Sequence, residues 1–172
     1  MNIPFPASHA EAMATFLEEL VRIPSLSTHE DAMATRLANE MQRVGFADVW
    51  TDRIGNVIGR VGSGQGPKLV LNGHMDIVDV GEVGRWTHPP YDGVIKDGVL
   101  FGRGACDMKG GLAAMVYGVK ALLDAGIEPA GDLYVVGVVQ EEPCEGCAMR
   151  VLVEEGGIRP CLLYTSDAAD DN

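Results

Sequence analysis

Apolar residues recur every three or four positions over three long stretches of the chain, which is the spacing of an amphipathic helix. A capping-box pattern of Ser8 and Glu11 marks the start of the first stretch, and Pro24 marks its end. Gly45 and Gly126 close the second and third stretches. A shorter helical pattern later in the chain stops at a pair of glycines. The sequence therefore predicts helices over residues 8–23, 27–44, 112–125 and 146–155.

Between the predicted helices lie short segments rich in β-branched residues and bounded by Gly, Asn or Asp, as strands usually are. The segment 133–139 is apolar throughout, which is typical of a strand covered on both faces. Strands and helices that alternate in this way favour an α/β fold. We therefore expect helices packed on a mixed, largely parallel sheet. The predicted strands are 49–51, 56–61, 68–71, 94–95, 99–101 and 133–139.

Composition and charge restrict the classes of partner. The chain has 172 residues, of which 47% are hydrophobic, a normal composition for one globular domain. Its formal net charge of −12 repels phosphate groups, so we expect neither nucleic acid nor a membrane as a partner. The first residues show no basic segment followed by an apolar one, and the four cysteines have no disulfide-framework spacing. Both features predict a cytoplasmic protein.

Acidic residues and a histidine gather where predicted strands end or a helix begins. His74 and Asp76 follow one strand, Glu141 and Glu142 follow the strand at 133–139, and the region before the third helix carries Asp107. Ligands of open α/β sheets bind beyond the carboxyl ends of the strands, so these side chains are expected to converge. Imidazole and carboxylate suit a metal such as zinc, and Asp76 is spaced to orient the imidazole. Adjacent glutamates point in different directions, so one can bind metal while the other faces a water molecule.

Three motifs carry a resemblance to a known family: Gly-His-Met-Asp at 73–76, Gly-Arg-Gly-Ala-Cys-Asp-Met-Lys-Gly-Gly at 102–111, and Gln-Glu-Glu at 140–142. In order and spacing they resemble the co-catalytic zinc peptidases and deacylases. That family includes acetylornithine deacetylase, succinyl-diaminopimelate desuccinylase, carboxypeptidase G and aminoacylase. The resemblance covers roughly residues 7–160. The stretch 74–93 looks most like the selenium-metabolism-linked hydrolases, and Asp79, where many members have proline, favours that branch.

The resemblance implies a zinc-peptidase-like domain that cleaves an amide bond in a peptide or an N-acyl amino acid. In such a site His74 would bind one metal ion, Glu142 would bind a second, and Asp107 would bridge them. Glu141 would act as the general base, and Asp76 would orient the imidazole. The expected cofactor is a pair of Zn²⁺ ions, with Co²⁺ or Mn²⁺ as possible substitutes. The resemblance also implies a full-length homodimer.

The ligand count indicates that part of the site lies outside this sequence. Two ions that share one bridging carboxylate usually take two further protein ligands each, and no histidine follows His88. The resembling family supplies a later Glu or Asp, a His near its C-terminus and a smaller inserted domain. We therefore expect residues 1–160 to be the N-terminal part of a catalytic domain. This fragment is predicted to bind metal weakly and to be inactive.

Residues 161–172 resemble translated sequencing-adapter read-through and are expected to be foreign to the protein. Asp167 falls near the position of the next acidic ligand of the resembling family. The family usually has proline after that ligand, whereas Ala168 follows here. We therefore do not assign Asp167 to the predicted site.

Two other function classes are compatible with parts of the sequence. The glycine-rich stretch 102–111 contains Lys109 and precedes a helix, which invites a nucleotide-binding interpretation, but it lacks the spacing of a phosphate-binding loop. Cys144 and Cys147 have Cys-x-x-Cys spacing, which occurs in redox and interaction modules. Acidic neighbours would raise the pKa of such thiols, so the pattern favours structural cysteines.

Overall fold

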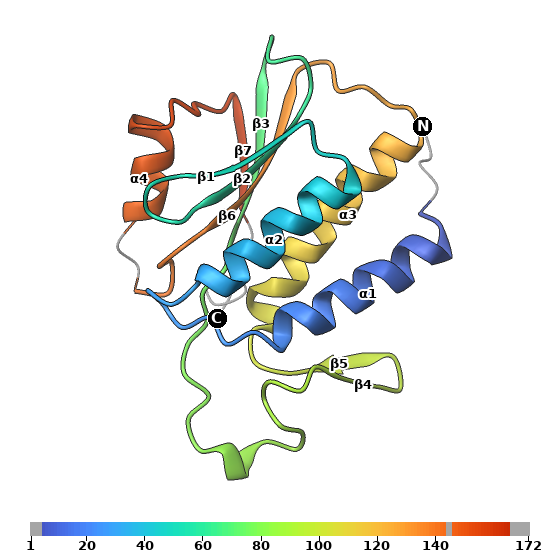
Figure 1. Cartoon of the computed structure of the whole chain (residues 1–172), viewed down its shortest axis with the longest axis vertical. Helices are drawn as coiled ribbons and strands as arrows, with labels where there is room; N and C mark the ends of the chain where they lie inside the picture. The colour runs from blue at the N-terminus through green and yellow to red at the C-terminus, as the bar shows by residue number, and fades with distance from the viewer. Residues whose placement is uncertain (1–4, 144–145, 166–172) are drawn as a thin grey trace.

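The computed structural model describes residues 5–143 and 146–165. It contains a five-stranded sheet, a separate two-stranded hairpin and four α-helices in this part of the chain (Figure 1). None of the helices in the described ranges is long and apolar enough to cross a membrane. The helices are α1 (Ala7–Val21), α2 (Asp31–Val44), α3 (Gly110–Asp124) and α4 (Cys147–Glu154). The strands are β1 (Asp48–Thr51), β2 (Val57–Val61), β3 (Lys68–His74), β4 (Val94–Lys96), β5 (Val99–Phe101), β6 (Asp132–Val138) and β7 (Leu162–Thr165).

The order of strands in the main sheet is β1-β2-β6-β3-β7. β3 pairs in parallel with β6 and β7, whereas β2 pairs antiparallel with β1 and β6. β6 is buried along its whole length, as its continuous apolar sequence predicts. The predicted α/β fold, with helices on a mixed sheet, is therefore confirmed. The sheet is not largely parallel as predicted, because two of its four strand pairs are antiparallel. β7 lies within residues 161–172, the segment that the sequence predicts to be foreign to the protein. The foreign origin of this segment stays a prediction.

The helices lie on both faces of the sheet. α1, α2 and α3 cover one face together, and α4 lies apart from them (Figure 1). A Cβ added at Gly73 would meet Met108 and Leu112, so this position of β3 faces α3. Its neighbour Asn72 points the opposite way and lines a pocket with Ala148 of α4. The core lies mainly under the three-helix layer, where apolar side chains of α1, α2 and α3 pack on β2, β3 and β6.

Local signals misplaced the starts of two helices. α1 begins at Ala7 with no side-chain cap, so the predicted capping box of Ser8 and Glu11 is wrong. α2 begins only at Asp31, because Thr28 adopts a left-handed conformation (φ 74°) that a helix cannot include. The predicted strand at 68–71 runs three residues further, to His74, because it pairs with β6 along its full length. His74 is therefore held by the sheet rather than by a loop.

Candidate metal centre

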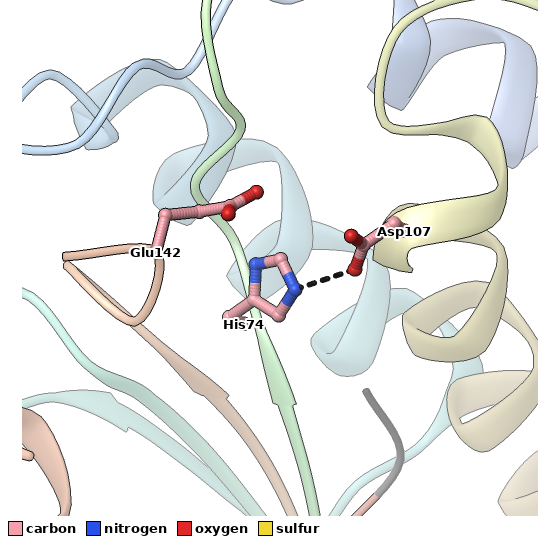
Figure 2. Close-up of side chains that lie close together, drawn as sticks. All are labelled: His74, Asp107 and Glu142. Atoms are coloured by element: carbon pink, nitrogen blue, oxygen red, sulfur yellow. Dashed lines mark hydrogen bonds and ion pairs between the residues drawn. The ribbon is translucent and has the colours of Figure 1, made fainter. Parts of the chain in front are cut away.

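Three potential metal ligands converge beyond the carboxyl ends of β3 and β6. His74 ends β3, Glu142 lies in the turn after β6, and Asp107 lies in an irregular helical turn, η2 (Ala105–Lys109), before α3. One ligand atom from each of the three side chains lies within 4.8 Å of the others. In Figure 2 the carboxylates of Asp107 and Glu142 flank the imidazole from two sides. The structure thus brings together the three residues that the sequence assigned to metal binding.

The imidazole of His74 is held at both nitrogens and is 2% exposed. Its Nδ1 lies 2.9 Å from the backbone oxygen of Asp76, and its Nε2 lies 2.9 Å from Oδ1 of Asp107. A carbonyl oxygen only accepts hydrogen bonds, so Nδ1 carries a hydrogen and Nε2 is the atom directed at the carboxylate. Burial acts to lower the pKa of His74, but the hydrogen bonds to Asp76 and Asp107 outweigh it and raise the pKa to about 9.

The Asp76 carboxylate is fully buried and connects three parts of the chain. It accepts hydrogen bonds from the hydroxyl of Ser27 and from the backbone amides of Glu141 and Glu142. Its Oδ1 lies 3.5 Å from Nδ1 of His74, so the closer contact to the imidazole is the Asp76 carbonyl. Burial acts to raise the pKa of Asp76, yet these hydrogen bonds hold it below its ordinary value.

A second buried carboxylate, Glu30, also holds the turn after β6 that carries Glu141 and Glu142. Its Oε1 accepts a hydrogen bond of 2.9 Å from the amide of Gln140, which has a left-handed conformation (φ 53°). Burial raises the pKa of Glu30 despite this bond. Three successive amides, from Gln140 to Glu142, are therefore held by two buried carboxylates. The sequence analysis missed Ser27 and Glu30, since both lie in the connection between two helices and no local pattern marks them.

The turn η2 presents Asp107 at the side of the imidazole. Asp107 is half-buried and lies three residues before α3, whose N-cap is Lys109. The peptide bond between Asp107 and Met108 is cis. The side chain of Lys109 is fully buried, and its Nζ donates to the backbone oxygens of Leu20 (2.9 Å) and Ile23 (2.7 Å). Lys109 thus joins η2 to the end of α1, and it does not neutralise a carboxylate.

Replacing Lys109 by methionine should lower the free energy of unfolding by about 2 kcal/mol at pH 7. Methionine fills the space of the lysine stem but leaves the carbonyls of Leu20 and Ile23 without this donor. Urea denaturation measures the change. Lys120→Met is the control, because Lys120 forms only a partly exposed pair with Asp124 and should change stability by less than about 0.5 kcal/mol. Equal stability of Lys109→Met and wild type would show that burial of the charge outweighs both hydrogen bonds.

The residue types and their separation fit a metal ion. Imidazole Nε2 and carboxylate oxygens are ordinary zinc ligands, and the hydrogen bond at Nδ1 is the contact that usually orients a metal-bound histidine. Nε2 of a neutral His74 would place a lone pair against the negative charge of Asp107. A positive charge is therefore needed between them, either a proton on the imidazole or a bound cation. Within the described residues this is also the one group of three that could hold a metal.

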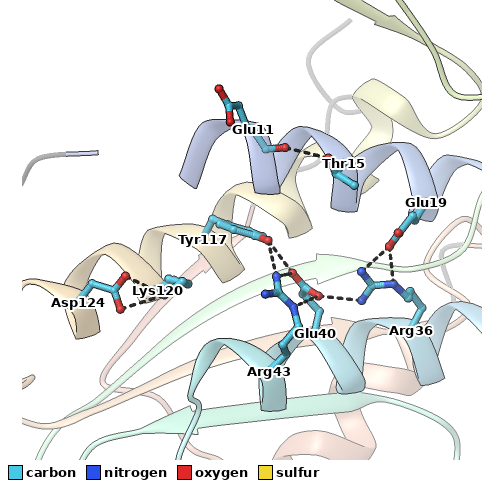
Figure 3. Close-up of polar contacts among 9 residues, drawn as sticks. All are labelled: Glu11, Thr15, Glu19, Arg36, Glu40, Arg43, Tyr117, Lys120 and Asp124. Atoms are coloured by element: carbon cyan, nitrogen blue, oxygen red, sulfur yellow. Dashed lines mark hydrogen bonds and ion pairs between the residues drawn. The ribbon is translucent and has the colours of Figure 1, made fainter. Parts of the chain in front are cut away.

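A second cluster of charged side chains lies between α1, α2 and α3 and is structural (Figure 3). Glu40 is 1% exposed and accepts hydrogen bonds from Arg36, Arg43 and the hydroxyl of Tyr117. Arg36 also binds Glu19 on α1. Burial acts to raise the pKa of Glu40, but these hydrogen bonds outweigh it and lower the pKa. Each charge has an opposite partner, which is the condition for burying a carboxylate between helices.

Glu40→Gln should destabilise the fold by about 2 kcal/mol at neutral pH, because it removes a buried charge that accepts bonds from Arg36 and Arg43. A carboxyl whose pKa is lowered on folding contributes stability above its unfolded pKa and loses it as the pH falls through the folded pKa. The difference from wild type should therefore shrink in acid. Urea denaturation at pH 7 and pH 3 tests this. Glu19→Gln, at a half-exposed partner, should have little effect, and an undiminished difference at pH 3 would contradict the pairing.

Several known proteins are similar to this chain in sequence. The protein YgeY of Escherichia coli K12, named as uncharacterized, is 39% identical over 176 residues, which cover 98% of this chain and 43% of the relative. A succinyl-diaminopimelate desuccinylase of Methylorubrum extorquens is 42% identical over 114 residues, covering 62% of this chain and 29% of the relative. The chain thus spans less than half the length of these relatives.

Solved structures share the fold. Human carnosine dipeptidase 1 superposes with a TM-score of 0.78 at 23% identity, over 93% of this chain and 39% of that protein. The M20 family metallo-carboxypeptidase Sso-CP2 of Sulfolobus solfataricus gives a TM-score of 0.77 at 20% identity, over 93% of this chain and 37% of that protein. The model of peptidase family M20/M25/M40 matches residues 70–167, a range that holds His74, Asp107 and Glu142. The chain therefore belongs to peptidase family M20/M25/M40.

Proposed function

We propose that the complete protein hydrolyses an amide bond in a peptide or an N-acyl amino acid, with a pair of metal ions as cofactor. The observation that carries this proposal is the convergence of His74, Asp107 and Glu142 beyond the ends of two neighbouring strands. Membership of a metallopeptidase family supports the same chemistry. The described residues supply three ligands, so a second ion would need others from the rest of the protein.

Each residue of the site has a distinct role in this proposal. His74 and Glu142 would hold one ion each, and Asp107 would bridge them. Bound Zn²⁺ lowers the pKa of water and polarises a carbonyl group, and Co²⁺ or Mn²⁺ could substitute. Glu141 takes the proton from the attacking water and returns it to the leaving amine. Asp76 holds the imidazole of His74 and the backbone of the two glutamates in position.

The alternatives have weaker support. The side chain of Lys109 is buried against backbone carbonyls, where it cannot meet a phosphate, so the nucleotide-binding interpretation of 102–111 loses the lysine on which it rested. Cys144, half of the Cys-x-x-Cys pattern, lies outside the described residues. Cys147 is a free thiol at the start of α4. We therefore favour the hydrolase over a nucleotide-binding or redox module.

We also propose a setting for the whole protein. Its substrate would be a small peptide or an acylated amino acid, a class supported by relatives named as a dipeptidase and a desuccinylase. It would work in the cytoplasm as a homodimer, without nucleic acid or membrane partners. A place in the selenium-metabolism-linked branch rests on the stretch 74–93 alone.

We propose that the native part of this chain ends near residue 160 and that residues 161–172, including Asp167, replace the native continuation of the protein. The fragment would then bind metal weakly and turn over nothing. Sequencing of the source DNA across the codons for Pro160 and Cys161 tests the boundary. A reading frame that continues into a later acidic ligand, a second domain and a late histidine would support it. A genuine stop after Asn172 would contradict it.

Calorimetric titration of the chelator-treated chain with Zn²⁺ and with ATP tests the function class. The hydrolase proposal predicts zinc binding that disappears in His74→Ala and no saturable binding of the nucleotide. The reverse pattern would reject it. Hydrolysis assays with dipeptides and N-acyl amino acids, run with and without zinc, test the activity of the complete protein. Zinc-dependent hydrolysis by the 172-residue chain would show that the fragment is active.

A further inference from the structure

We propose that Ser27 is a positioning residue for the metal centre, which it stabilises by fixing the carboxylate of Asp76. The proposal rests on the proposed function, since it concerns how that site is held. Ser27 lies in the connection between α1 and α2, 49 residues away in sequence from Asp76. Its hydroxyl donates a hydrogen bond of 2.6 Å to Oδ2 of Asp76.

The Asp76 carboxylate is the point through which Ser27 would act. Oδ2 accepts from Ser27 and from the amide of Glu142, and Oδ1 accepts from the amide of Glu141. The same residue contacts Nδ1 of His74 through its carbonyl. A rotation of this carboxylate would therefore release the backbone of both glutamates at once and would disturb the residue that orients the imidazole.

The connection that carries Ser27 is itself fixed against the end of β3. The backbone oxygen of Ser25 accepts from the amide of Ile77 at 2.9 Å, and the Ser25 hydroxyl donates to the backbone oxygen of Met75 at 2.8 Å. Leu26 forms a parallel bridge with Ile77. These contacts place the Ser27 hydroxyl beside Asp76. Its hydrogen bond therefore restricts the carboxylate without needing a further rearrangement of the chain.

A hydroxyl donor is well suited to this position. The carboxylate is buried, so each of its oxygens needs donors, and a hydrogen bond to a carboxylate is stronger than one between neutral groups. Without the hydroxyl, Oδ2 would keep only the amide of Glu142 among the donors described here. Residues that orient metal ligands from outside the coordination sphere typically change metal affinity 10- to 100-fold when they are removed. We expect an effect of about that size for Ser27.

The test compares Ser27→Ala with Ser27→Thr, which keeps a hydroxyl, and with Thr28→Ala, which removes from the same connection an exposed hydroxyl that contacts the His29 imidazole and not Asp76. The first readout is amide hydrogen exchange in the metal-free chain, measured relative to core amides of β6. Ser27→Ala should lower the protection of the Glu141 and Glu142 amides, Ser27→Thr should restore it, and Thr28→Ala should leave it at the wild-type level.

The second readout is the affinity for Zn²⁺ by calorimetric titration. Ser27→Ala should weaken it by about 10- to 100-fold, with recovery in Ser27→Thr and little change in Thr28→Ala. Unchanged amide protection and affinity in Ser27→Ala would overturn the proposal, as would an equal loss in Thr28→Ala. If the wild-type chain binds no zinc, the proposed function fails, whereas the exchange measurement still decides whether Ser27 fixes the turn.

Discussion

Alanine at Asp107 should weaken zinc binding at least about 100-fold, whereas glutamine at Glu141 should leave the affinity nearly unchanged and remove activity from the complete protein. Asp107 supplies a ligand atom beside Nε2 of His74, so its loss removes both a ligand and the negative charge that balances the cation. Glutamine keeps the shape of Glu141 but cannot accept a proton. Removal of a general base typically lowers turnover by about 10²- to 10⁴-fold.

Two measurements separate these roles. Titration of the chelator-treated chain with Zn²⁺ gives the affinity of wild type, Asp107→Ala and Glu141→Gln. Steady-state hydrolysis by the complete protein at saturating zinc gives kcat. Asp124→Ala is the control for loss of an acidic side chain, since Asp124 pairs with Lys120 and His9 away from the site. Loss of metal in Glu141→Gln, together with full retention in Asp107→Ala, would invert the assignment.

Gly110→Ala should both destabilise the chain and weaken zinc binding, although it adds one methyl group at the start of a helix. The Cβ would lie 2.6 Å from the backbone oxygen of Ala105, the first residue of η2. Because the contact is with backbone, the turn that carries Asp107 must shift. Overpacking of this kind costs typically 1–3 kcal/mol. The shift would also move Asp107 away from His74, so stability and metal affinity should fall together.

Gly118→Ala is the matched control on the same helix. Its Cβ would meet nothing within 4 Å, and alanine in an exposed helix interior is favoured over glycine by about 1 kcal/mol. Urea denaturation should therefore separate the two variants by roughly 3 kcal/mol, with Gly118→Ala more stable than wild type and unchanged in zinc affinity. If Gly110→Ala were as stable as Gly118→Ala, η2 would be able to move freely, and its fixed geometry could not be what positions Asp107.

Local patterns predicted the elements well where burial follows sequence periodicity. The stripe of apolar residues in α3 and the continuous apolar run of β6 are confirmed, because each is determined by which face must leave water. Patterns that depend on one side chain were less reliable. Ser8 makes no cap, since α1 already begins at Ala7, and α2 begins only at Asp31, after the left-handed Thr28.

The residues of the metal centre were accessible to sequence reasoning because the carboxyl ends of neighbouring strands share one edge. His74 ends β3 and Glu142 follows β6, and the parallel pairing of these strands brings both to that edge. The structural role of Lys109, whose buried side chain links η2 to the end of α1, could not be predicted in the same way. Its partners are the carbonyls of Leu20 and Ile23, and a backbone carbonyl has no sequence signature.

The sequence by itself determined the α/β class, the family and the residue types of the metal centre, since periodicity and motif spacing are local properties of the chain. The tertiary structure decided how those residues are held. The Ser27 hydroxyl bonds Asp76, which is 49 residues away in the sequence. The Glu30 carboxylate bonds the amide of Gln140, which is 110 residues away. Such contacts depend on the path of a connection between helices and on which buried acceptor needs a donor. They exist only after the sheet and its three-helix layer have packed together.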